Sequence, residues 1–97
     1  MSKFYLGLDL GQAQDYTALV ILEQAPEDDY HLRHIERFPL GTSYPAIVER
    51  VKTILQAEPI AGKTVLIVDK TGVGAPVVDM FKAAGLSPMA VTITGLS

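Results

Sequence analysis

The sequence contains no cysteine and no long uncharged hydrophobic stretch. Without cysteine, neither a disulfide framework nor a thiolate metal site can form. No segment approaches the length of apolar sequence that a membrane span needs. The first residues, MSKFYLGLDLG, carry one lysine and an acid inside the apolar run, a pattern that differs from a signal peptide. The absence of cysteine is compatible with a cytoplasmic protein, and we expect no membrane contact.

An excess of basic residues is also missing, because the formal net charge is −3. The chain thus lacks the electrostatic footprint of a free-standing nucleic-acid-binding protein. A DNA contact would need a divalent metal at the acids, or basic surface from elsewhere. With 48% hydrophobic and 20% charged residues, the 97 residues are expected to fold as a single globular domain, 1–97.

The first part of the chain alternates in hydrophobicity with a period of two, as strands do. Residues 3–10 place four apolar side chains on one face and Asp9 on the other. Residues 16–24 and 30–40 are predicted as two further strands, and the short connections predict an antiparallel meander. His31 and His34 lie three apart in the third strand, so we expect them on opposite faces and not as a metal-binding pair.

The period then changes to that of a helix. Apolar residues recur from Ile47 to Leu55 with helical spacing, Thr42 or Ser43 can cap the start, and Pro45 is tolerated in the first turn. A buried strand is predicted at 64–69, then a helix that ends at Gly85, and a last strand at 87–94. The order β-β-β-α-β-α-β predicts an α/β fold, a mixed sheet with helices on its faces.

Two acids are the leading candidates for chemistry. Asp9 is either a carboxylate that caps the following turn or a ligand for a hard cation. Asp69 follows the apolar run VLIVD, at the strand end where open α/β sheets place their ligands, although it could equally cap the next helix. If the two strands lie side by side and parallel, the carboxylates approach each other and need a cation between them. This pairing favours Mg²⁺ or Mn²⁺.

The remaining polar positions have simpler interpretations. The segment TGVGAP could present backbone N–H groups to a phosphate, but a plain tight turn is the more frequent case. Asp15 and Thr17 flank a hairpin turn, where an Asp usually bonds nearby backbone amides. Asp79 lies on the second helix and is interpreted as a solvated position.

Two segments together resemble the nuclease domain of phage terminase large subunits. GLDLGQAQDYTALVIL is similar to the first nuclease motif, and LIVDKTGVGAPVVDMF is similar to the second. The resemblance covers nearly the whole chain and implies an RNase H-like fold with strand order 3-2-1-4-5. It also implies DNA cleavage by a two-metal-ion mechanism with Mg²⁺ or Mn²⁺. Asp9 and Asp69 match the first two metal-binding acids, and the substrate or phosphate loop matches Asp15, Thr17, Thr71, Gly72 and Gly74.

The chain departs from this family at one point. The third metal-binding acid of the family comes from a helix after the fifth strand, and the sequence stops at Ser97. We therefore expect a partial RNase H-like domain that lacks the C-terminal helix. Its two-acid site should bind metal weakly, and the isolated chain should show little or no nuclease activity.

Two alternatives stay open. One is a non-catalytic phage or prophage assembly module on the same fold, which would form a homo-oligomer through apolar surface that the missing helix leaves exposed. The other is a fragment of an actin- or sugar-kinase-like ATPase, a superfamily that also opens with Asp-x-Gly in a first strand.

Overall fold

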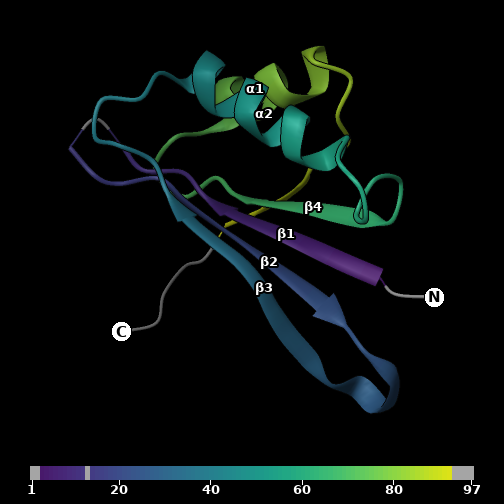
Figure 1. Cartoon of the computed structure of the whole chain (residues 1–97). Coiled ribbons are helices and arrows are strands. Elements are labelled where there is room, and N and C mark those ends of the chain that lie inside the picture. Colours follow the sequence, from purple (N-terminus) through teal and green to yellow (C-terminus); the bar gives the residue numbers. More distant parts are fainter. Residues whose placement is uncertain (1–2, 13, 93–97) are drawn as a thin grey trace.

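The computed structural model describes residues 3–12 and 14–92, which form a five-stranded sheet and two α-helices (Figure 1). The elements in chain order are β1 (Lys3–Asp9), β2 (Ala18–Gln24), a 3-10 helix η1 (Pro26–Asp28), β3 (Tyr30–Arg37), α1 (Tyr44–Leu55), β4 (Thr64–Asp69), α2 (Ala75–Ala83) and β5 (Met89–Val91). The strand order is β3-β2-β1-β4-β5. The pairs β3–β2 and β2–β1 are antiparallel, and β1–β4 and β4–β5 are parallel. The predicted element order and sheet order are confirmed.

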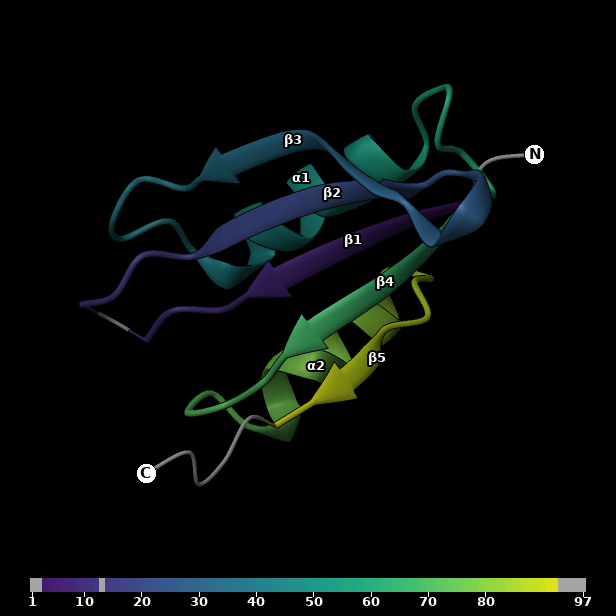
Figure 2. The same cartoon turned by 90° about the horizontal axis from the view of Figure 1, so that it is seen from below.

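Both helices cover the same face of the sheet, and the opposite face carries none of the described helices (Figures 1 and 2). The covered face holds the core, in which Leu6 and Leu8 of β1 pack with Val51 of α1 and Phe81 of α2. These four side chains are fully or almost fully buried. The apolar alternation of β1 and the helical stripes are therefore confirmed, whereas the helices predicted on the faces of the sheet lie on one face only. No helix in the described part of the chain is long and apolar enough to cross a membrane.

The helix ends follow the predicted signals. The Ser43 hydroxyl accepts a hydrogen bond from the Ala46 amide at 3.3 Å, and Pro45 lies in the first turn of α1. This side-chain cap satisfies one of the amides that the first helical turn leaves without a backbone partner. After α2, Gly85 takes a φ of +87°, which favours glycine and ends the helix.

Four strands are shorter than expected, and β1 ends one residue early, at Asp9. β2 begins at Ala18 and β3 ends at Arg37, and one further bond, from the Phe38 amide to the Thr17 carbonyl at 2.8 Å, lies just beyond both strands. Pro39, which has no N–H, cannot continue the ladder. β5 pairs through three residues only, 89–91, after Pro88. Residues 93–94 of the predicted last strand lie outside the described residues.

A β-bulge changes the sides on which the histidines of β3 lie. His31 is opposite Glu23 and His34 is opposite Ile21, with Arg33 as the extra residue between them. Glu23 and Ile21 share a face of β2, so the two histidines also share one face. The prediction of opposite faces is wrong, because a bulge inserts one residue and reverses the alternation. Local sequence carries no sign of this insertion.

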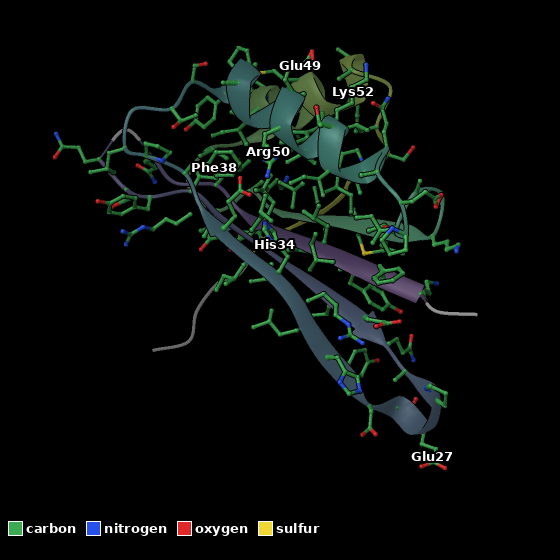
Figure 3. All side chains as sticks on the ribbon, viewed as in Figure 1. Glu27, His34, Phe38, Glu49, Arg50 and Lys52 are labelled. Carbon is green, nitrogen blue, oxygen red and sulfur yellow. The ribbon has the colours of Figure 1, made fainter. Side chains whose placement is uncertain are left out.

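An ion pair joins α1 to β3. Arg50 donates to both carboxylate oxygens of Glu36, at 3.0 and 2.8 Å, and His34 bonds the same carboxylate at 3.0 Å. Figure 3 shows Arg50 and His34 pointing into the space between helix and sheet, while Glu49 points away from the sheet. The hydrogen bonds from Arg50 lower the pKa of Glu36 to about 2. The pair is partly exposed, so its energetic value is that of a surface pair with good geometry.

We expect Glu36→Gln to lower the free energy of unfolding by about 1 kcal/mol at pH 7. Because the folded-state pKa of Glu36 is lowered, its stabilisation is complete above the ordinary value of 4.5 and is lost as the pH falls toward about 2. Urea unfolding at pH 7, 4 and 2 measures this, with Glu49→Gln as a control that changes nothing. A difference between wild type and Glu36→Gln that persists unchanged at pH 2 would contradict the assignment.

Candidate metal centre

The sheet register places Asp9 and Asp69 directly opposite each other. Each is the last residue of its strand, and β1 and β4 are parallel neighbours. Neighbouring strands lie about 4.8 Å apart, and paired residues share a face. Both carboxylates therefore stand side by side at the carboxyl edge of the sheet, on the face without helices. They line a hollow of about 410 Å³ together with Asp15, Tyr16 and Thr71.

Asp69 is held in one orientation by Thr71. The Thr71 amide donates to Oδ1 of Asp69 at 2.9 Å, and the Thr71 hydroxyl donates to the same oxygen at 2.6 Å. These bonds lower the pKa of Asp69 below its ordinary value, the hydroxyl contributing most. Oδ2 carries neither bond. Asp69 is thus an ionised carboxylate with a fixed geometry, a good ligand for a hard cation.

The β1–β2 connection is fixed around Gly11. The Gly11 amide donates to Oγ1 of the buried Thr17 at 2.9 Å, and the Tyr44 hydroxyl donates to the Gly11 carbonyl at 3.0 Å. A Cβ on Gly11 would lie 2.6 Å from the carbonyl oxygen of Tyr16, and closer still to that of Asp15. Gly11 follows Asp9 by two residues, so this packing fixes the chain where it leaves the edge that carries Asp9 and Asp69. Tyr44 is 33 residues away in sequence, and nothing in the local sequence predicts its role.

The loop after Asp69 forms a tight turn. The amides of Val73 and Gly74 both donate to the Lys70 carbonyl, at 3.1 and 3.2 Å. Gly72 and Gly74 have φ values of +82° and +80°, which favour glycine. A Cβ on Gly72 would collide with the side chain of Gln12, so the two loops that border the site are in contact. Since these amides are engaged within the loop, its geometry is that of a plain turn, and the substrate role of Thr71, Gly72 and Gly74 stays a prediction.

The carboxylate pair fits a small divalent cation. Mg²⁺ is usually held by one or two carboxylates together with waters and substrate phosphates, and the edge offers two carboxylates on an open face. Over residues 3–12 and 14–92, no group of three or more histidine, aspartate or glutamate side chains is arranged to hold a metal. Asp15 is exposed and lines the same hollow, and Asp79 is exposed on α2. The described residues therefore provide a two-acid site.

A larger hollow lies elsewhere. It measures about 730 Å³ and opens between the C-terminal end of α1 and the β2–β3 hairpin, with Phe4 and Ile54 among its apolar lining residues. Phe4 is near the start of β1, whereas Asp9 ends that strand, so this hollow is at the other end of the sheet. Its polar residues include Arg33 and Glu23, which bond each other at 2.7 Å. Size alone does not mark the site here, because the carboxylate pair lines the smaller hollow.

Comparison with solved structures identifies the fold. The crystal structure of the large terminase nuclease from thermophilic phage G20c with bound magnesium matches with a TM-score of 0.78 and 21% identity, over 98% of this chain and 47% of that chain. The chain has the RNase H-like fold of the large terminase nuclease. The zinc-bound crystal structure of the same terminase nuclease matches with a TM-score of 0.76 and 21% identity, over 97% of this chain and 50% of the other. The chain thus spans about half the length of these terminase nuclease structures.

A weaker structural similarity relates the chain to another enzyme. The PPX-GPPA enzyme of Aquifex aeolicus matches with a TM-score of 0.61 and 8% identity, over 95% of this chain and 36% of that chain. No protein-family model and no curated protein sequence matches the chain. At these identities the comparisons establish the fold, and the terminase nuclease is the better match of the two.

Proposed function

We propose that the chain is a divalent-cation-dependent nuclease domain of the terminase type, which acts on DNA phosphodiesters in the cytoplasm of a bacterium or phage-infected cell. The observation that carries this proposal is the register, which pairs Asp9 with Asp69 at the ends of neighbouring parallel strands. The terminase nuclease of the same fold was solved with magnesium, cobalt and zinc bound. That finding supports a divalent cation as the partner of the two acids.

The residues have distinct roles in this proposal. Asp9 and Asp69 hold the cation, and Thr71 orients the Asp69 carboxylate toward it. A bound Mg²⁺ or Mn²⁺ polarises a phosphoryl oxygen and makes bound water a better nucleophile. Two-metal-ion hydrolysis requires further ligands beyond these two acids. A site with two carboxylates holds the ion weakly, so we expect slow cleavage at most from the isolated chain.

Nicking of supercoiled plasmid DNA in Mn²⁺ tests this function. We expect slow nicking by the wild-type chain that stops with EDTA and falls at least tenfold in Asp69→Asn, because the variant loses one of two charged ligands. Asp29→Asn, an exposed acid before β3 at the other end of the sheet, is the matched control and should nick at the wild-type rate. Equal nicking by wild type and Asp69→Asn, or wild-type protein that neither binds Mn²⁺ nor nicks, would contradict the proposal.

A second candidate function is a homodimeric assembly module, and the open face of the sheet favours it. Ile35, Leu32, Met89 and Tyr30 are 66%, 58%, 57% and 54% exposed. The register places Leu32 opposite Leu22, which is in turn opposite Tyr5, and Ile35 opposite Val20. These apolar side chains therefore share the face without helices.

The size of this open face suits a second copy of the chain. Five strands at about 4.8 Å and seven residues at about 3.3 Å give a projected area on the order of 500 Å². Projecting side chains raise the accessible area toward the ~800 Å² per partner of a standard interface. Two copies packed sheet to sheet would remove an apolar patch that monomers rarely leave exposed.

Sedimentation velocity at about 100 µM checks the homodimer. We expect wild type to dimerise and Ile35→Glu to be monomeric, because a charge among the exposed apolar side chains of the open face is costly to bury. Leu40→Glu changes an exposed residue outside the sheet and should leave the dimer intact. A monomeric wild type would exclude this candidate, and a dimer indifferent to Mn²⁺ would favour it over the nuclease.

A further inference from the structure

Arg37 lies in one row with the acid pair. Arg37 is opposite Ala18, Ala18 is opposite Asp9, and Asp9 is opposite Asp69. These four residues therefore share the open face and the same edge of the sheet. Arg37 is two strands from Asp9, about 10 Å between Cα atoms. Ala18, the residue between Arg37 and Asp9 in this row, has a small uncharged side chain.

The guanidinium of Arg37 packs on an aromatic ring that belongs to the metal-binding edge. Its central carbon is 4.0 Å from the centroid of the Tyr16 ring, and Tyr16 lines the hollow of Asp9 and Asp69. Stacking occupies the flat face of a guanidinium and leaves its in-plane N–H groups able to bind two oxygens of a phosphate. Tyr16 thus orients Arg37 beside the hollow without consuming its hydrogen-bond donors.

The other two arginines form ion pairs with glutamates. Arg33 bonds Glu23 at 2.7 Å, and Arg50 bonds Glu36 through two nitrogens. Within residues 3–12 and 14–92, Arg37 makes no ion pair. Arg37 is also exposed. It is therefore a cation with its charge available at the edge that carries the acid pair.

We infer that Arg37, stacked on Tyr16, binds a backbone phosphate of the DNA strand and aligns that strand with the Asp9–Asp69 pair. This inference rests on the proposed function. A polyanion that approaches two aspartates in a chain of net charge −3 is repelled unless positive charge lies nearby. The cation that the acids would bind supplies one contact, and Arg37, whose Cα lies about 10 Å from that of Asp9, supplies a second.

Fluorescence anisotropy with a 12-nucleotide fluorescein-labelled single strand in Mn²⁺ tests the contact, read within minutes at two salt concentrations. We expect Arg37→Ala to weaken binding about five- to tenfold at low salt, with a salt slope shallower by about 0.7, the value for one lost phosphate contact on a single strand. Arg37→Lys should fall between Arg37→Ala and wild type, because it keeps the charge and loses the planar fork. Lys82→Ala, which removes an exposed positive charge on α2, should stay within twofold of wild type.

Mn²⁺ calorimetry on the same proteins separates this inference from the proposed function. Arg37→Ala should bind Mn²⁺ as wild type does, since its site is two strands from the acids. If wild type binds Mn²⁺ but Arg37→Ala and Arg37→Lys bind the oligonucleotide as wild type does, the inference is overturned and the function stands. If the wild-type protein binds no oligonucleotide, the inference about Arg37 is also overturned. Oligonucleotide binding that depends on Arg37 but not on Mn²⁺ supports the contact and contradicts the metal-dependent function.

Discussion

Asp9→Asn is expected to abolish the calorimetric signal of Mn²⁺ binding, with an affinity loss of at least tenfold. The reason is geometric. Asp9 and Asp69 are paired in register at the same edge of the sheet, and the described residues place no third acid or histidine with them in an arrangement that could hold a metal. A neutral amide oxygen in place of one of two carboxylates leaves a single charged ligand for a hard divalent cation. A site with more acids would tolerate the change, whereas this one has no substitute.

Asp79→Asn provides the control for this experiment. Asp79 is an exposed acid on α2 and lies outside the hollow that Asp9 and Asp69 line, so its replacement removes the same charge elsewhere. We expect Asp79→Asn to bind Mn²⁺ as wild type does. Equal Mn²⁺ affinities for wild type and Asp9→Asn would show that the carboxylate pair is not the binding site.

Gly11→Ala is expected to have the largest effect of any small substitution near the site. The added Cβ would meet backbone carbonyl oxygens of Asp15 and Tyr16, which cannot move as a flexible side chain would. The connection must then shift, and the bonds of Gly11 to Thr17 and Tyr44 are lost or weakened. Overpacking of this kind costs about 2 kcal/mol, which corresponds to a fall in Tm of about 10 °C for a domain of this size.

Gly7→Ala in β1, the strand that leads into this connection, is the matched control. A Cβ there would be 3.4 Å from Cγ2 of Val20, which is an ordinary contact on the open face. Thermal unfolding followed by circular dichroism should show little change for Gly7→Ala and a clear loss for Gly11→Ala. Gly11→Ala should also bind Mn²⁺ more weakly, since the chain leaving Asp9 is displaced. Similar Tm values for the two variants would contradict the packing described around Gly11.

Much of the fold could be predicted from the sequence because its signals are local. The alternation around Leu6 and Leu8, the helical spacing that follows Pro45 and the stop at Gly85 each act within a few residues. The pairing of Asp9 with Asp69 was also predicted, since both acids end apolar strands and parallel neighbours align such ends. The register confirms that these two residues lie side by side.

The remaining features depend on contacts between distant segments. The bulge at Arg33 reverses the alternation of β3 through its pairing with β2, and a period of two gives no sign of it. The bond from Tyr44 to Gly11 and the stack of Arg37 on Tyr16 join residues that only the folded sheet brings together. The placement of both helices on one face follows from the hand of each connection, which hydrophobic patterns do not record.

The open face links the two candidate functions. Asp9 and Asp69 stand at the carboxyl end of this face, and the exposed Leu32 and Ile35 lie on its edge strand β3. A partner sheet packed over Leu32 and Ile35 leaves the hollow of Asp9 and Asp69 at the margin of the interface. Self-association and metal binding are therefore compatible, and Ile35→Glu separates them by removing the first without touching the second.

The most direct test of the central claim is an anomalous difference map from a crystal of the chain soaked in MnCl₂. We predict a peak between the Asp9 and Asp69 carboxylates, within bonding distance of an oxygen from each, and no such peak in crystals of Asp9→Asn. Well-ordered Asp9 and Asp69 side chains without a manganese peak between them, or with the carboxylates turned to opposite faces of the sheet, would contradict a shared divalent cation.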